Sequence, residues 1–588
     1  MKTHWFNQLV LLTIILLATF LHVWQLSEFP PAISGDEAKN GLEGLHLLAE
    51  PELRIFAPAN AGREALYHYL LLIPLYLFGA TPWALRLLPT MLSLLLLPLT
   101  YRWTRELLPT QSGVALLATG WLAMSPWMLN LSRLGLRGIL LVPCMIAAYY
   151  FFWRGYLSSY KVSNFIRAKS SKYFALSGLF LGLTLHTYTA SRTLPFAFIL
   201  MAIALSLYDR ARLKTIWLGL LTTAATAILI FAPLGYYFLT HPAAFLYRSR
   251  GVSLRANYEL FHAHTGQTFT QYLFTTWLDN LRWFIEMSQP GLPMPLIYLC
   301  WFMGLATLLI HARRHANYAI ITLSFAIGLL PIFIGLPTTM RVILAMPTTY
   351  IILALGVFSP FTLKRPHPQP LSQKERGDKN DSPSQARRRD KNDSLLPLGE
   401  GLGVRVFLLI LLLLSTLALP DTFQPSRWIG QPPLPTPLDE VFTIAANRIR
   451  ELVLVEKRSV LLPQAVYGVP TVRFLLQENF SPTPPANPAP TDSIALFWPT
   501  DWQRWFGATV PSFILLSPSA TNGQGYIETI GQWSPDRMAE LEQFIQAQAN
   551  APDTETIHNR DGQPLANILT LPRPQLALHA APTQPLKL

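Results

Sequence analysis

Ser34-Gly35-Asp36-Glu37-Ala38 lies just beyond the first long apolar run of the chain, which extends from Leu9 to Leu26. Ser34 and Glu37 have the spacing of a capping box, in which each side chain bonds the backbone N–H of the other. Asp36 then falls in the first turn of a helix, where the helix dipole favours an ionised carboxylate able to accept a proton. The pattern predicts either two acids that only cap a surface helix, or a carboxylate that does chemistry beside a membrane.

The composition is that of a polytopic membrane protein. Of the 588 residues, 51% are apolar and 13% are charged, and the mean hydropathy is +0.30. Apolar runs of about 18–20 residues recur along the chain, which is the length of a membrane-spanning helix. The net charge of +13 could indicate nucleic acid, but the basic residues lie mostly in short loops between apolar runs, where they orient the spans. We therefore predict no nucleic-acid partner.

We expect an all-α domain over residues 1–420 with about 11 transmembrane helices and an internal N-terminus. The basic clusters, such as Arg102/Arg105 and Arg313/Arg314, then fall on the cytoplasmic side. The apolar segment 66–80 is short and contains Pro74, so we interpret it as a helix in the membrane interface. The expected spans are 6–26, 84–101, 112–130, 138–153, 173–189, 193–208, 215–238, 292–310, 317–336, 341–358 and 406–420.

Outside the spans, the chain changes in composition. Residues 364–405 are polar, Pro-rich and low in complexity, which predicts a disordered cytoplasmic insert. Residues 421–437 form a Pro-rich linker, and residues 438–588 are expected to form a small extracytoplasmic α/β domain. That domain is predicted from helical patterns at 438–455 and 535–548 and from short apolar runs at 459–462, 493–498 and 512–516.

Arginine residues gather at the predicted outer ends of the spans, which the positive-inside rule disfavours. Each one alone is explained by a side chain that reaches a lipid headgroup or pairs with a structural acid. Together with Asp36 they indicate a second hypothesis, in which guanidinium groups bind a lipid-linked phosphate beside a catalytic carboxylate. The residues concerned are Arg63, Arg86, Arg133, Arg137, Arg192, Arg248, Arg250, Arg255 and Arg341.

This combination fits one chemistry. A polyprenyl-phosphate sugar already carries its leaving group, so its transfer needs cations for the departing phosphate and one base for the acceptor hydroxyl. One carboxylate with several arginines therefore suits an inverting single displacement. A retaining mechanism needs a second carboxylate as nucleophile, a role that Glu37 could fill, although neighbouring residues on a helix do not face the same way. The sequence contains no P-loop or dinucleotide fingerprint.

At this point the sequence resembles the membrane glycosyltransferases of the GT-C type, specifically the protein O-mannosyltransferase and aminoarabinose-transferase group that uses polyprenyl-phosphate sugars. The match covers about residues 5–200. It is carried by Asp36-Glu37, by Gly62-Arg63-Glu64-Ala65-Leu66-Tyr67-His68-Tyr69, by Phe78-Gly79 and Arg86-Leu87-Leu88-Pro89, by Ser125-Pro126-Trp127 with Ser132-Arg133, and by Gly178 to Tyr188 with Arg192 and Pro195.

The resemblance implies that Asp36 is the base for the acceptor and that Arg133 or Arg341 holds the lipid phosphate. The chain departs from the family at Arg63-Glu64-Ala65, where Lys-Pro-Pro is usual, and an Asp that often follows the Ser-Arg pair is absent. These departures argue against carrying over the sugar specificity of the protein mannosyltransferases.

The sequence hypothesis is a glycosyltransferase of the cytoplasmic membrane with its site on the extracytoplasmic face. Its partners would be a polyprenyl-phosphate sugar and a lipid, glycan or protein acceptor. We assign catalysis to Asp36 and Glu37, donor-phosphate binding to Arg63, Arg86, Arg133 and Arg341, and substrate binding to Glu64, His68, Tyr188 and Arg192.

Three alternatives stay open at this stage. A transporter or flippase of a lipid-linked saccharide would also place arginines at a phosphate, although transporters typically contain internal repeats, and no convincing repeat is evident here. His68 could simply pack among interfacial aromatic residues. Asp36 with Glu37 or Glu64 could hold a divalent cation, but the sequence predicts no dedicated metal site and no cofactor firmly.

Overall fold

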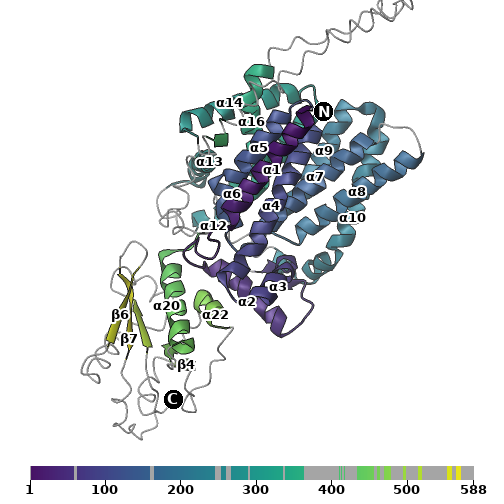
Figure 1. The fold of residues 1–588 in the computed structure, drawn as a ribbon. Coiled ribbons are helices and arrows are strands. Elements are labelled where there is room, and N and C mark those ends of the chain that lie inside the picture. The colour runs from purple at the N-terminus through teal and green to yellow at the C-terminus, as the bar shows by residue number, and fades with distance from the viewer. Residues whose placement is uncertain are drawn as a thin grey trace, which may run out of the picture.

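The computed structural model of the chain describes most of its first 362 residues and separate pieces of the remainder. The described ranges are 2–57, 62–158, 164–245, 253–259, 267–288, 292–335, 338–362, 410, 412–413, 416, 434–455, 460–463, 469–477, 494–497, 514–518, 553–558 and 564–570. These residues are mostly helical, and the long helices lie side by side in one bundle (Figure 1).

Seven described helical segments are long and apolar enough to cross a membrane. They are built from α1 (Lys2–Val23), α4 (Pro82–Leu107), η1 and α7 (Arg137–Leu140 and Leu141–Ser158), η2 and α9 (Thr189–Thr193 and Leu194–Tyr208), η3 and α10 (Arg210–Arg212 and Leu213–Thr240), α14 (Met294–Ala312) and α15 (Ala316–Ile334). An eighth would be the pair α5 (Ser112–Met124) and α6 (Pro126–Ser132), which is bent by 55°. The bend falls at Pro126, which has no N–H to continue the helix. The predicted polytopic membrane protein is thereby confirmed.

The expected number of about eleven spans is not reproduced. Two further predicted spans are present as helices but are not both long and apolar enough to count as membrane spans. They are α8 (Asn164–Leu185) and α16 (Met346–Thr362) with the preceding η5 (Ile343–Ala345). Basic residues in the first turns of α8, among them Arg167 and Lys169, interrupt its apolar run. The predicted span at 406–420 lies mostly outside the described residues, as does the predicted insert at 364–405.

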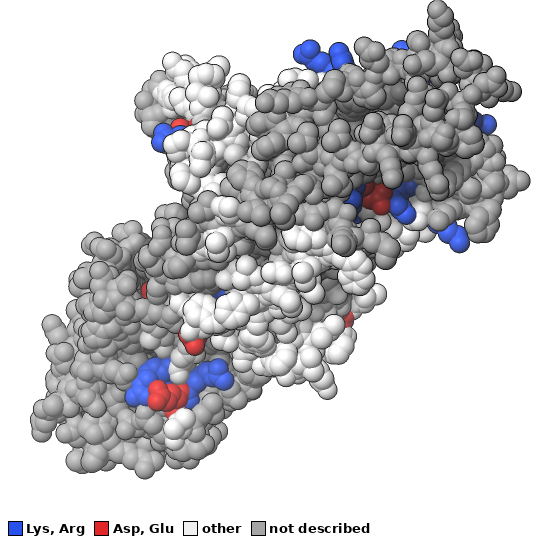
Figure 2. Space-filling view, turned by 45° about the horizontal axis from the view of Figure 1, so that its top comes forward, with Lys and Arg blue, Asp and Glu red and all other residues white. Residues whose placement is uncertain are grey.

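The outer surface of the bundle is suited to lipid. Large apolar side chains are exposed along α1, α9, α10 and α14. In Figure 2 the described surface is largely uncharged, and its Lys, Arg, Asp and Glu side chains form small separate groups. Inside the bundle, Gly304 of α14 and Gly356 of α16 lie directly against the carbonyl oxygens of Ile352 and Cys300, so the two helices approach at backbone distance. Small residues permit such close packing in membranes.

The structural elements that build the site lie at one end of the bundle (Figure 1). Here α2 (Gly35–Ala49) packs against α3 (Leu66–Phe78), and the short strands β1 (Phe56–Ala57) and β2 (Arg63–Glu64) pair antiparallel between them in sequence. The predicted helix at 66–80 is therefore present as α3. Farther along the chain lie α12 (Leu254–Asn257) and α13 (Phe269–Met287).

The C-terminal residues add two helices and five strands to the described structure. α20 (Pro437–Leu454) and α22 (Pro470–Gln477) pack together, and α22 also packs on α2. β3 (Val460–Pro463) pairs parallel with β4 (Ile494–Phe497), while β5 (Ile514–Pro518), β7 (Pro564–Thr570) and β6 (Asp553–His558) form an antiparallel sheet in that order. The helix predicted at 438–455 is confirmed as α20. The one predicted at 535–548 and most of the linker lie outside the described residues, and the α/β domain as a whole stays a prediction.

Candidate active site

The capping box predicted at Ser34 and Glu37 is present at the start of α2. The Glu37 N–H donates to Ser34 Oγ at 3.3 Å, and the Ser34 N–H donates to Glu37 Oε2 at 3.4 Å. The two neighbouring acids face different ways, as adjacent residues on a helix do. The Asp36 side chain is 51% exposed, whereas that of Glu37 is 0% exposed. Asp36 is therefore the accessible carboxylate at this end of the helix.

Asp36 is fixed by a network of buried polar side chains. Arg63 donates from Nη2 to Asp36 Oδ1 at 2.9 Å, and its Nη1 donates to Asn40 Oδ1. His68 Nε2 also lies 3.2 Å from Asn40 Oδ1, and Asn40 Nδ2 donates to the Gly135 carbonyl at 2.7 Å. Burial, together with the charges of Arg137 and Arg63, lowers the pKa of His68 to about 3. The imidazole is thus neutral, and it must carry its proton on Nε2 because the amide oxygen can only accept.

A second ion pair is formed by Glu64, which follows Arg63 in β2. Glu64 Oε2 accepts from Arg137 Nη1, and both side chains are buried. The Arg137 guanidinium also lies over the Tyr188 ring, 5.7 Å from its centroid. Successive side chains of a strand point in opposite directions. β2 therefore joins the Asp36 network, through Arg63, to a second group formed by Glu64, Arg137 and Tyr188.

Glu37 points into the protein and belongs to a different group. Arg86 Nε donates to Glu37 Oε1 at 3.0 Å, and the Gly135 N–H donates to the same oxygen at 3.3 Å. Desolvation raises the pKa of Glu37, and the opposing attraction of Arg86 does not reverse this. The remaining Arg86 donors bond the carbonyl oxygens of Leu26, Ser27, Pro30 and Ala32. Glu37 and Arg86 thus join the start of α2 to α4 and to the loop that follows α1.

Arg133 performs a similar task from the end of α6. It is fully buried, and its Nη2 donates to the carbonyls of Leu21 and Trp24 while its Nη1 donates to that of Phe29. Arg86 and Arg133 were both predicted to bind the donor phosphate. In the structure both guanidinium groups bond backbone carbonyls between residues 21 and 32, so their placement supports a structural role in place of the predicted one.

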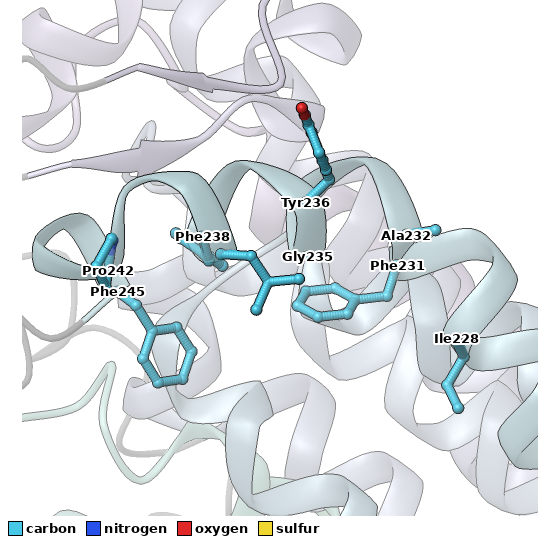
Figure 3. Close-up of a pocket in the computed structure, with 9 residues that line it drawn as sticks. Ile228, Phe231, Ala232, Gly235, Tyr236, Phe238, Pro242 and Phe245 are labelled. Atoms are coloured by element: carbon cyan, nitrogen blue, oxygen red, sulfur yellow. The ribbon is translucent and has the colours of Figure 1, made fainter.

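Arg192 stands beside an apolar pocket. The pocket has a volume of about 610 Å³ and is lined by Ile228, Phe231, Ala232, Gly235, Tyr236, Phe238, Leu239, Pro242 and Phe245. The rings of Phe231 and Phe245 point to the same side of the chain, and Tyr236 points away from them (Figure 3). The Arg192 guanidinium lies 4.0 Å from the centroid of the Phe245 ring and donates to the Phe245 carbonyl.

The pocket lies close to the ion pair of Glu64 and Arg137, because β1 contacts both and because the charges of Arg192 and Glu64 attract each other. Phe56 pairs with Glu64 across the hairpin, and its ring packs on those of Tyr237 and Phe238 near the end of α10. Arg192 lies within electrostatic reach of Glu64. The predicted substrate residues Glu64, His68, Tyr188 and Arg192 are therefore parts of connected groups around β2.

Arg341 lies in a loop that touches the same region. The neighbouring Met340 packs directly against Gly138 of η1, and the Tyr188 ring also lies beside Gly138. The Arg341 N–H donates to the Thr338 carbonyl at 3.0 Å, which gives this loop a turn. Arg341 thus comes from a distant part of the chain to the vicinity of Arg137 and Tyr188.

Sequence reasoning missed Asn40, which organises the Asp36 network. Asn40 lies four residues after Asp36 and therefore on the same face of α2, a relation that the sequence contains. Arg137 was noticed as an outer cation but was not assigned to the site. Within the described part of the chain, no three His, Cys, Asp or Glu side chains gather as metal ligands.

Comparison with known proteins defines the class. Residues 65–237 match the family described as dolichyl-phosphate-mannose-protein mannosyltransferase. The fold is similar to that of ArnT from Cupriavidus metallidurans bound to undecaprenyl phosphate, with a TM-score of 0.53 and 12% identity over 99% of this chain and 100% of that chain. It is also similar to the apo oligosaccharyltransferase of Archaeoglobus fulgidus, with a TM-score of 0.50 and 14% identity over 95% of this chain and 74% of that one. No curated protein sequence matches the chain.

These matches confirm the resemblance to GT-C glycosyltransferases that the motifs indicate. The chain is a membrane protein with the fold of that class, and its segment 65–237 matches the mannosyltransferase family.

Proposed function

We propose that this protein transfers a sugar from a polyprenyl-phosphate carrier to an acceptor hydroxyl, with Asp36 as the base. The observation that carries the proposal is a half-exposed carboxylate held at 2.9 Å by the buried Arg63, which is itself bonded to Asn40. Such a fixed carboxylate can take a proton from a bound hydroxyl, because its direction is set before the substrate arrives. Of the two adjacent acids only Asp36 is exposed, because Glu37 is fully buried and paired with Arg86, and one accessible acid in this pair favours inverting displacement.

In the proposed reaction the acceptor oxygen forms a bond to the anomeric carbon and gives its proton to Asp36. The bond between that carbon and the phosphate oxygen breaks, and the polyprenyl phosphate leaves with the electron pair. Cations stabilise the charge that develops on this phosphate. Arg192 is the strongest candidate, with Arg341 as a second, since both lie near the Glu64 and Arg137 group.

The apolar pocket beside Arg192 fits the first isoprene units of the donor. Its lining is aromatic and aliphatic, and its volume of about 610 Å³ lies in the range of small-molecule sites. A polyprenyl phosphate requires an apolar channel that ends at a cation, and the Arg192 guanidinium over the Phe245 ring supplies this junction. The proposal thus places the lipid along the end of α10 and its phosphate toward β2.

The site is proposed to face the outside of the cell. Arg86, which holds the loop before Asp36, lies in the first turns of α4, and Arg102 lies near its other end. At 1.5 Å per residue, the two positions are about 24 Å apart along the helix. Arg102 and Arg105 belong to the basic clusters that the positive-inside rule places in the cytoplasm, and the Asp36 end is then extracytoplasmic.

The test is a transfer assay in detergent with a labelled polyprenyl-phosphate sugar. Asp36→Asn should lower the rate by about 10²–10⁴-fold, the usual contribution of a general base, with donor binding retained. Glu50→Gln, which changes an exposed carboxylate at the other end of α2, should leave the rate unchanged. Substantial transfer by Asp36→Asn would refute the assignment. Lipid movement across vesicle membranes without any transfer would instead favour a transporter.

A further inference from the structure

The C-terminal helices hold the backbone immediately before the proposed catalytic helix. The Ile33 N–H donates to Thr443 Oγ1 of α20 at 3.1 Å, and Thr471 Oγ1 of α22 donates to the Ile33 carbonyl, also at 3.1 Å. Ile33, Thr443 and Thr471 are all buried. Both polar groups of one residue are therefore satisfied by side chains more than 400 positions farther along the chain.

The Thr443 hydroxyl acts as the acceptor, and not the donor, of the hydrogen bond to Ile33. Its proton is donated to the Asp439 carbonyl one turn earlier in α20, at 2.7 Å, so its lone pair is directed to Ile33. Near the start of α20, Asp439 itself lies beside Gly35, the first residue of α2. A buried backbone group without a partner is costly, so these contacts specify where the chain before α2 must lie.

A third contact extends this arrangement along α2. The ring of Phe474 from α22 lies directly against the Cα of Gly41, and Leu85 of α4 approaches the same position. A side chain larger than hydrogen at Gly41 would displace them. Gly41 follows Asn40, whose amide binds Arg63 and the Gly135 carbonyl. The C-terminal helices thus touch α2 both before Asp36 and one turn after it.

Three consecutive residues before Asp36 are fixed by different parts of the chain. The Ala32 carbonyl accepts from Arg86 of α4 at 2.7 Å, Ile33 is held by α20 and α22, and Ser34 forms the capping box with Glu37. Of these, the Ile33 contacts alone involve the C-terminal helices. From this we propose that Thr443 and Thr471 are positioning residues for Asp36, and that α20 and α22 form part of the catalytic unit. This inference rests on the proposed function of Asp36.

The test uses the full-length protein with both hydroxyls removed, as Thr443→Val and Thr471→Val together. The isosteric change leaves the Ile33 N–H and carbonyl without their partners. Amide hydrogen exchange in the peptide covering residues 33–42 should rise about tenfold or more, because local opening becomes easier. The kcat of transfer should fall about tenfold through misdirection of the base, while the KM for the donor stays within about twofold.

Two further variants separate positioning from general stability. Thr443→Ser with Thr471→Ser keeps both hydroxyls and should restore exchange and kcat. Asn447→Ala changes an exposed residue one turn farther along α20 and should alter neither quantity. If the double valine variant does not fold, Thr443→Ala removes one of the two bonds and is measured in the same way.

Unchanged exchange and unchanged kcat in a folded valine or alanine variant would overturn the inference. A lower kcat that serine does not restore would do the same, because the hydroxyl would then not be the cause. Failure of the proposed function gives a different result. Asp36→Asn would keep its activity, while the valine variant would still show faster exchange at residues 33–42.

Discussion

Arg86 provides the sharpest test of how the outer arginines are used. The sequence assigned it to the donor phosphate, whereas the structure gives it a bond to Glu37 and bonds to four backbone carbonyls. Removing one partner of a buried ion pair typically costs about 3–5 kcal/mol, because the other charge is left uncompensated. Arg86→Ala should therefore destabilise the protein by at least about 3 kcal/mol, since the loop carbonyls also lose their charged donor.

The assay is thermal unfolding in one fixed detergent, measured beside donor binding. Arg102→Ala, an exposed arginine on the same helix, should change stability by less than about 0.5 kcal/mol. Adding Glu37→Gln to Arg86→Ala should recover part of the loss, because the two side chains are coupled. Arg86→Lys should recover little, since an ammonium group cannot reproduce the guanidinium geometry. Unaltered unfolding of Arg86→Ala together with weaker donor binding would refute the structural role and restore the sequence assignment.

Three further outcomes are expected. Arg192→Ala should raise the donor KM about 10–100-fold in the transfer assay by removing a charged partner of the phosphate, and an unchanged KM would exclude Arg192 from the site. Since the pKa of His68 is lowered to about 3 by burial, its protonation favours the unfolded chain, whose histidine titrates near 6.5. The contribution of the neutral His68 to the free energy of unfolding is complete above pH 6.5 and falls as the pH drops, by about 1 kcal/mol between pH 7 and 5.5. His68→Gln should remove this part of the pH dependence when the free energy of unfolding is measured at several pH values. Gly135→Ala should destabilise by about 1–3 kcal/mol in the same measurement, because its Cβ would lie 2.8 Å from Glu37 Cγ and 3.3 Å from the Leu85 carbonyl oxygen; a variant as stable as the parent would contradict this packing.

The start of α2 could be predicted from the sequence because its causes are local. A capping box needs two residues three positions apart, and Ser34 with Glu37 supplies them. The bundle could be predicted for a similar reason, since an apolar run of sufficient length is itself the signal for a membrane span. The number of spans was harder, because α8 begins with basic residues and α16 is short.

The pairing of Arg86 with an acid was among the expected alternatives, but the bonds of Arg86 and Arg133 to backbone carbonyls could not be predicted, because those carbonyls are distant in sequence from both residues. Arg133 bonds carbonyls more than 100 residues earlier in the chain. Sequence reasoning considered lipid headgroups, acids and substrate phosphate as partners for an outer arginine. A fourth partner is the backbone of a loop, whose carbonyls need other donors where no helix or strand supplies them. Residues 24–33 form such a loop between α1 and α2, and its two prolines, Pro30 and Pro31, provide no N–H of their own.

The paired acids at the start of α2 differ in their surroundings, so one of them can support the fold while the other carries the proposed chemistry. Neighbouring positions on a helix differ by about 100° in direction, so two adjacent carboxylates cannot enter the same environment. Glu37 turns inward and binds Arg86 and the Gly135 N–H. Asp36 turns outward and accepts from Arg63, while half of its surface stays open. The inward acid cannot be exchanged with the outward one without burying a charge that lacks Arg86, and Asp36 is therefore the acid of the pair that stays accessible.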